Sequence, residues 1–107
     1  MDDTPLIEVD FVPPGTAMRV EVQGYPPLAV FNVDGGFFVC DDTCSHGQAS
    51  LSDGVIEGDT VECPWHNGVF CLRTGAAKGH PAVTPIRVYP AHVRDGQVCI
   101  AVSKDAL

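Results

Sequence analysis

Lysine and arginine are absent from residues 20–72, between Arg19 and Arg73. The same segment contains eight of the 14 acidic residues, and the rest of the chain contains six acids and all six bases. The formal net charge of −8 therefore comes from this segment. Phosphate groups are bound by lysine and arginine, so this distribution argues against a nucleic acid partner. It favours a partner with a basic surface, which an acidic field attracts into fast, short-lived encounters. The eight acids are Glu21, Asp34, Asp41, Asp42, Asp53, Glu57, Asp59 and Glu62.

Long apolar runs and a secretion signal are also absent. The sequence has no stretch of about 18 apolar residues, which excludes a transmembrane helix. Residues 1–5 are acidic and lack the basic and apolar regions of a signal peptide, so we expect a soluble, cytoplasmic protein with no membrane contact. The five cysteines are an odd number, which argues against a disulfide framework. With 107 residues, the chain is expected to form one domain over 1–107. The sequence shows no coiled-coil pattern, so we expect a monomer.

Convincing helical periodicity is missing as well, and strand signals dominate. Short runs rich in Val, Ile and Phe alternate with Gly, Pro and Asp turns. We therefore predict an all-β fold of small antiparallel sheets in a sandwich or barrel, with a subdomain inserted at about 41–85. A short helical turn capped by Ser50 or Ser52 is expected at 49–53, and an irregular loop at 76–85. Strands are predicted at residues 6–12, 17–22, 28–33, 36–40, 55–57, 60–63, 69–73, 86–93 and 97–102.

Two short motifs each combine one cysteine with one histidine. The first is Cys44-Ser45-His46-Gly47, and the second is Cys63-Pro64-Trp65-His66-Asn67-Gly68. Thiolates and neutral imidazoles are metal ligands, and each motif ends in a glycine that permits a tight turn. The sequence therefore predicts a metal centre held by both loops.

Four interpretations of these motifs compete. The residues could be unrelated, could form a structural Cys2His2 zinc site, or could include a Cys–His nucleophile pair. A zinc site of this type usually pairs Cys with Cys and His with His, and a nucleophile pair leaves the second motif unexplained. A [2Fe–2S] cluster with two Cys on one iron and two His on the other suits mixed loops, because each loop can send one ligand to each iron.

The paired motif resembles the signature of Rieske [2Fe–2S] proteins. Over residues 6–102 the chain resembles the small Rieske ferredoxins of bacterial aromatic-ring-hydroxylating dioxygenase systems, which have a Rieske-like fold. This resemblance implies one [2Fe–2S] cluster bound by Cys44, His46, Cys63 and His66. It also implies an electron carrier that links a flavin-containing, NAD(P)H-dependent reductase to a Rieske-type terminal oxygenase. The chain lacks G-x-G-x-x-G and has no room for a flavin domain, so it is expected to be a carrier and not the enzyme. A subunit of a nitrite-reductase-like system and a zinc-binding module remain the alternatives.

The cluster environment is expected to give a low reduction potential. High-potential Rieske proteins have a disulfide between positions that match Ala49 and Trp65, and hydroxyls at positions that match Gly68 and Phe70. This chain has neither, and fewer donors stabilise the reduced cluster less. We expect a midpoint near the low end of the Rieske range, about −150 mV. The resemblance places the following residues around the cluster: Gly47, Gln48, Pro64, Trp65, Asn67, Gly68, Phe70 and Pro81.

The other cysteines and histidines are expected to have ordinary roles. Cys40, Cys71 and Cys99 lie in apolar runs and should be buried as small hydrophobic side chains. His80 and His92 have no cysteine at ligand spacing. On the ligand loops, an apolar docking collar is predicted from Gln48, Ala49, Pro64 and Trp65.

Overall fold

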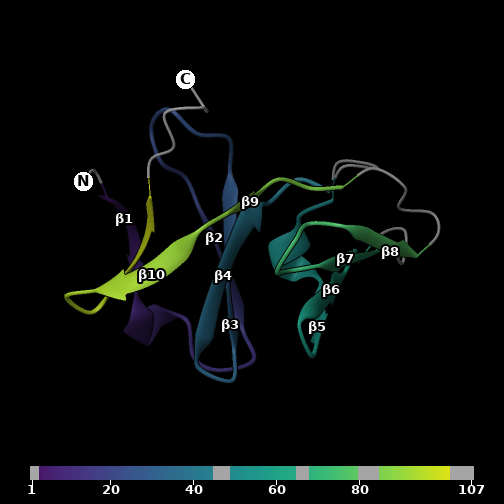
Figure 1. Ribbon diagram of the computed structural model, residues 1–107, viewed down its shortest axis with the longest axis horizontal. Helices are drawn as coiled ribbons and strands as arrows, with labels where there is room; N and C mark the ends of the chain where they lie inside the picture. The colour runs from purple at the N-terminus through teal and green to yellow at the C-terminus, as the bar shows by residue number, and fades with distance from the viewer. Residues whose placement is uncertain (1–2, 45–48, 65–67, 80–84, 102–107) are drawn as a thin grey trace.

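The computed structural model describes residues 3–44, 49–64, 68–79 and 85–101. These residues form three small antiparallel sheets, with strand orders β1-β11-β10, β2-β3-β4-β9 and β5-β6-β7-β8 (Figure 1). The predicted all-β fold is confirmed. Two short 3-10 helices accompany the strands, η1 (Val9–Phe11) and η2 (Leu51–Asp53). The strands are β1 (Asp3–Glu8), β2 (Ala17–Val20), β3 (Leu28–Val33), β4 (Gly36–Asp41), β5 (Val55–Glu57), β6 (Thr60–Glu62), β7 (Val69–Cys71), β8 (Ala77–Gly79), β9 (Val88–Tyr89), β10 (Ala91–Arg94) and β11 (Gln97–Ala101).

The sheet β2-β3-β4-β9 is the middle layer of the molecule. Alternate residues of a strand face opposite sides of its sheet, and in β3 both sides are buried. Leu28 and Val30 pack into one core together with residues of β11. Ala29 and Phe31 pack into a second core together with residues of β6 and β7. The continuous apolar run of β3 is thus explained by a strand between two cores.

Asp-Gly turns join β3 to β4 and β10 to β11, in gaps that the sequence leaves between predicted strands. Asp34 and Gly35 have φ values of 52° and 91°, and Asp95 and Gly96 have φ values of 54° and 77°. Two successive positive φ angles make a type I′ turn, whose twist matches that of the flanking strands. These turns fix the registers Val33↔Gly36 and Arg94↔Gln97.

Two strand predictions at the ends of the chain are wrong. Residues 6–12 are not one strand, because β1 ends at Glu8 and η1 follows. The strand also begins before Pro5, which is tolerated because β1 is an edge strand with a register shift after Pro5. Residues 86–93 are not one strand either. Pro90 has no N–H to donate to a strand partner, and it separates β9 of the middle sheet from β10 of the first sheet.

The third sheet lies beside the middle sheet, on the side away from β10 (Figure 1). It spans Val55 to Gly79, inside the segment predicted as an inserted subdomain. The prediction of an irregular loop over 76–85 is wrong for Ala77–Gly79, which form β8 and pair with β7. In the described part of the chain, no helix has the length and apolar character needed to cross a membrane.

Candidate metal centre

The two predicted ligand loops are closed by matching backbone hydrogen bonds. The amide of Cys44 donates to the carbonyl of Ala49 over 2.9 Å, and the amide of Cys63 donates to the carbonyl of Gly68 over 2.7 Å. In both loops the acceptor lies five residues after the cysteine. An antiparallel pairing supports each closure, Thr43↔Ser50 in the first loop and Glu62↔Val69 in the second. Cys44 and Cys63 therefore each begin a loop whose two ends are joined by the same hydrogen bond and antiparallel pairing.

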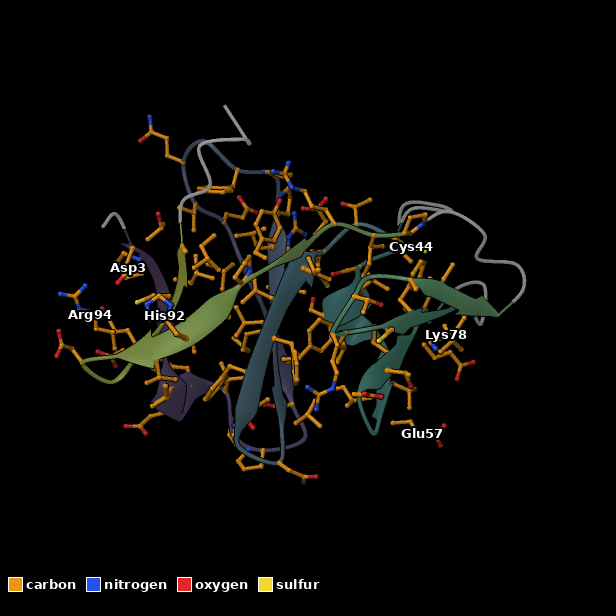
Figure 2. All side chains as sticks on the ribbon, in the orientation of Figure 1. Asp3, Cys44, Glu57, Lys78, His92 and Arg94 are labelled. Carbon is orange, nitrogen blue, oxygen red and sulfur yellow. The ribbon has the colours of Figure 1, made fainter. Side chains whose placement is uncertain are left out.

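The structure brings both cysteines into one apolar core. Cys44 is 2% exposed and Cys63 is 0% exposed, and both belong to the core that contains Leu51, Phe70 and Ile86. Cys44 lies on the part of the molecule that carries the third sheet (Figure 2). A thiolate in an apolar core is stable when it binds a metal, because an unpaired buried charge is costly. Two such thiols in matching loops fit the sulfur side of a [2Fe–2S] cluster.

A close backbone contact joins Gly75 to Ile86. Gly75 has a φ of 82°, and its carbonyl accepts a 2.9 Å hydrogen bond from the amide of Ile86. A Cβ at this position would lie 2.1 Å from the carbonyl oxygen of Ile86. Only glycine allows this approach. Because Ile86 packs in the core of Cys44 and Cys63, the contact with Gly75 holds Ile86 in that core.

The first loop is supported by a buried carboxylate. Asp42 is 2% exposed, and its side chain accepts hydrogen bonds from the Ser50 hydroxyl and from the Ser52 amide. Ser50 lies at the N-cap position of η2, but its hydroxyl makes no cap bond there. The predicted cap at Ser50 is therefore wrong, because the hydroxyl donates to Asp42. Sequence reasoning counted Asp42 only as one of the acids of the segment, since nothing in its spacing marks it as buried.

The acidic segment is thus not uniformly exposed. Asp42 is buried, and the carboxylate of Asp41 accepts a 2.6 Å hydrogen bond from the Tyr89 hydroxyl. Burial and this hydrogen bond raise the pKa of Tyr89, so the hydroxyl keeps its proton. The six other acids are at least partly exposed: Glu21, Asp34, Asp53, Glu57, Asp59 and Glu62.

Of the residues predicted around the cluster, some are buried, one is exposed and the others lie outside the described residues. Gly68 and Phe70 are buried beside the second loop, and Pro64 is exposed. Ala49 is 1% exposed, so it cannot contribute to an exposed docking collar, and that part of the prediction is wrong. Within residues 3–44, 49–64, 68–79 and 85–101, no group of three or more metal-binding side chains occurs. The remaining predicted residues lie outside those ranges: His46, Gly47, Gln48, Trp65, His66, Asn67 and Pro81.

The other cysteines are buried thiols, as expected. Cys40 is 0% exposed, Cys99 is 3% exposed and Cys71 is 8% exposed. Burial raises the pKa of Cys40 and of Cys99, whereas a hydrogen bond with Thr74 lowers the pKa of Cys71. Cys40 shares the core of Cys44 and Cys63, so it provides a matched reference for any cysteine substitution there.

His92 lies at the opposite end of the molecule from Cys44 (Figure 2). Its Nε2 atom is 3.1 Å from Oδ2 of Asp3, and Arg94 reaches the same oxygen over 2.8 Å. The Arg94 hydrogen bond, and secondly that of His92, lowers the pKa of Asp3. This group connects β1 to β10 and has no place in the metal centre. His80 lies outside the described residues.

Comparison with known proteins identifies the class. The family model of the Rieske [2Fe–2S] domain matches residues 3–90, and the chain belongs to this family. Its cofactor is one Rieske-type [2Fe–2S] cluster, which agrees with the two buried cysteines in matching loops.

Among the curated relatives are ferredoxin subunits of aromatic dioxygenases. The 3-phenylpropionate/cinnamic acid dioxygenase ferredoxin subunit of Photorhabdus laumondii is 49% identical over 91% of this chain and 91% of its own length. The biphenyl dioxygenase ferredoxin subunit of Pseudomonas sp. strain KKS102 is 44% identical over 100% of this chain and 98% of its own length. The similarity therefore covers whole ferredoxin subunits and not only a shared motif.

Solved structures show the same similarity. The ferredoxin of Sphingomonas yanoikuyae B1 superimposes with a TM-score of 0.90 at 44% identity, over 95% of this chain and 100% of that one. The ferredoxin in a complex of reduced oxygenase and oxidised ferredoxin of carbazole 1,9a-dioxygenase gives a TM-score of 0.85 at 39% identity, over 92% of each chain. That structure shows a ferredoxin of this fold bound to its oxygenase.

Proposed function

We propose that the protein is the one-electron carrier of an aromatic-ring-hydroxylating dioxygenase system. It takes electrons from a flavin-containing, NAD(P)H-dependent reductase and delivers them to a Rieske-type terminal oxygenase. The observation that carries the proposal is the burial of Cys44 and Cys63 in one core, in matching loops of a Rieske domain. Ferredoxin subunits at 44% and 49% identity support the assignment to a dioxygenase system. We further infer a cytoplasmic monomer with a single domain over 1–107.

The proposed ligands are Cys44 and Cys63 on one iron and His46 and His66 on the other. The bound cluster supplies one-electron chemistry. The apolar side chains around the two cysteines exclude water from the sulfur side, which strengthens the interaction between the cluster and nearby charges. The histidines, which precede Gly47 and Asn67, complete the mixed nitrogen and sulfur ligand set.

The partners are proposed to dock with the help of the acidic segment. Asp53, Glu57 and Glu62 belong to η2, β5 and β6, close along the chain to the ligand loops. Glu57 and Asp53 are exposed, so their charges act on an approaching protein. A basic partner surface is attracted by this field, which speeds encounter and permits rapid release. On the ligand loops, Pro64 is exposed, and with Gln48 and Trp65 it is proposed to form the docking collar.

The spectrum of the purified protein tests the cofactor assignment. We expect a red-brown protein whose visible absorption bleaches when the cluster gains one electron. Pulsed EPR of the reduced protein is expected to show couplings to the nitrogen nuclei of two histidines. A colourless protein that contains zinc contradicts the proposal and supports the alternative of a zinc-stabilised interaction module.

The turnover of a reconstituted system tests the pathway assignment. The protein is mixed with a purified dioxygenase reductase, a terminal oxygenase, NADH and an aromatic substrate. We expect product formation to depend on this protein, and the same mixture without it is the control. If the protein instead supports electron delivery only to a nitrite reductase, the dioxygenase assignment is wrong.

The midpoint potential is expected near the low end of the Rieske range, about −150 mV. Gly68 and Phe70 are buried beside the second loop and carry no hydroxyl that can donate to a sulfur. Without such donors the added electron is stabilised less. A redox titration followed by visible absorption measures the midpoint. A value above about +100 mV, well inside the upper part of that range, contradicts this prediction.

A further inference from the structure

Three hydrogen bonds to Asp42 join the start of the first ligand loop to the residues that follow the loop. Its side chain accepts from the Ser50 hydroxyl and, over 2.9 Å, from the Ser52 amide. Its backbone carbonyl accepts from the amide of Leu51 over 2.6 Å. These bonds hold η2 against the residue that lies two positions before Cys44. Asp42 therefore fixes both the start and the end of the first loop.

The negative charge of Asp42 is only partly offset. In the described part of the chain, Arg19 is the one cation within ion-pair distance of this carboxylate, with Nε 3.8 Å from Oδ2. The Arg19 side chain is half exposed and also pairs with Glu21 over 3.1 Å. A half-exposed cation at 3.8 Å is partly screened by water and cannot cancel a buried charge. A net negative charge thus remains beside the first loop.

This charge lies close to the proposed electron-carrying centre. The Cα atoms of Asp42 and Cys44 are at most about 7 Å apart, since two residues of extended chain span no more than this. Charges that are buried are screened less than exposed ones. Adding an electron near a fixed negative charge is unfavourable, and a nearby positive charge makes it less unfavourable. Asp42 and Arg19 should therefore act on the reduction potential in opposite directions.

We propose that Asp42 and Arg19 form a charge pair that sets the reduction potential of the centre. Asp42 is a positioning residue for the first loop, and its buried charge also holds the midpoint potential low. Arg19 partly offsets that charge and raises the midpoint potential. The inference rests on the proposed role of Cys44 as a cluster ligand, and it assigns a function to two residues outside the ligand motifs.

The substitution Asp42→Asn removes the negative charge of the side chain and allows its hydrogen bonds to be kept. Asparagine has the same shape, so its side-chain oxygen can still accept from the Ser52 amide. Its side-chain amide can donate to the hydroxyl of Ser50, which also serves as an acceptor. Arg19→Gln removes the cation from a half-exposed position on β2 and keeps the three hydrogen bonds that Asp42 accepts. Asp53→Asn, which neutralises an exposed acid after the same loop, is the matched control.

The test is a redox titration of the intact, cluster-loaded protein and its variants. We expect Asp42→Asn to raise the midpoint potential, Arg19→Gln to lower it, and the double variant to fall between the two. Asp53→Asn should cause a smaller shift than either. Iron content and amide hydrogen exchange at Leu51 and Ser52 report whether the loop stays in place.

Opposite shifts of the two single variants distinguish an electrostatic role from a structural one. If both variants shift the midpoint in the same direction, or if Arg19→Gln shifts it no more than Asp53→Asn does, the inference is wrong. Arg19→Gln decides the question even if Asp42→Asn does not fold. An iron-free wild-type protein overturns both the proposed function and this inference. A loaded wild-type protein with unmoved midpoints in the variants overturns this inference alone.

Discussion

Replacement of Cys44 or Cys63 with alanine is expected to give a protein that holds no [2Fe–2S] cluster. Each substitution removes one of the two thiolates proposed for the same iron, and that iron cannot be held by a single sulfur ligand and the bridging sulfides. Both cysteines are buried in one core, where each variant puts a methyl group in place of a proposed thiolate ligand. Because metal binding contributes directly to folding, the variants should also unfold at a lower temperature than the wild-type protein.

The matched control is Cys40→Ala. Cys40 is as deeply buried as Cys63 and packs in the same core, but burial raises the pKa of its thiol and keeps it protonated. This variant should retain full cluster content and lose about 1 kcal/mol of stability from the missing buried atom. Iron and sulfide per chain and visible absorption measure the outcome. Equal cluster loss in all three variants would show that the effect is one of core packing and not of ligation.

Replacement of Gly75 with alanine is expected to destabilise the fold by about 2 to 5 kcal/mol. The added Cβ would lie 2.1 Å from the carbonyl oxygen of Ile86 and 3.3 Å from a methyl group of Val88. The backbone would also have to keep a φ of 82°, which is unfavourable for any residue with a Cβ. Relief of the clash moves Ile86 out of the core that holds Cys44 and Cys63, so the cluster should also be lost more readily.

Gly96→Ala isolates the effect of the clash. Gly96 has a similar φ of 77°, but nothing lies within 4 Å of the position of its Cβ. This variant should therefore lose only the conformational contribution of about 1 to 2 kcal/mol. Urea unfolding, monitored by a probe of the β-sheets, gives both free energies. If the two variants are equally destabilised, the contact between Gly75 and Ile86 does not hold Ile86 in the core.

Local sequence patterns located most of the strands and turns. β3 and β5 have the predicted bounds, Leu28–Val33 and Val55–Glu57, because turn residues delimit them clearly. The errors occur where long-range pairing decides. β8 forms because Ala77–Gly79 find a partner in β7, although Gly79 and the following prolines favour irregular structure. Pro90 divides one apolar run between two sheets, and no local pattern shows that the two halves have different partners.

The candidate site shows the same division. The Cys and His motifs indicate a metal centre because their chemistry and spacing are local properties. The sequence also shows directly that residues 20–72 lack lysine and arginine. It does not show which of the acids in that segment face solvent. Ala49 was expected in a docking collar and Asp42 only as one acid of the segment, and both are buried. They are buried because η2 packs against β2 and β3. This contact joins residues that are far apart in the sequence.

The sequence by itself determined the ligand chemistry, the β-rich character and the acidic charge of the central segment, because these depend on residue types and short spacings. Only the tertiary structure decided that Cys44 and Cys63 share one core, that Gly75 must approach Ile86, and that Asp42 faces Arg19 from the inside of the fold. These contacts depend on how the three sheets pack against one another. Packing brings together residues that are distant in the sequence, and no local sequence pattern reveals such pairs.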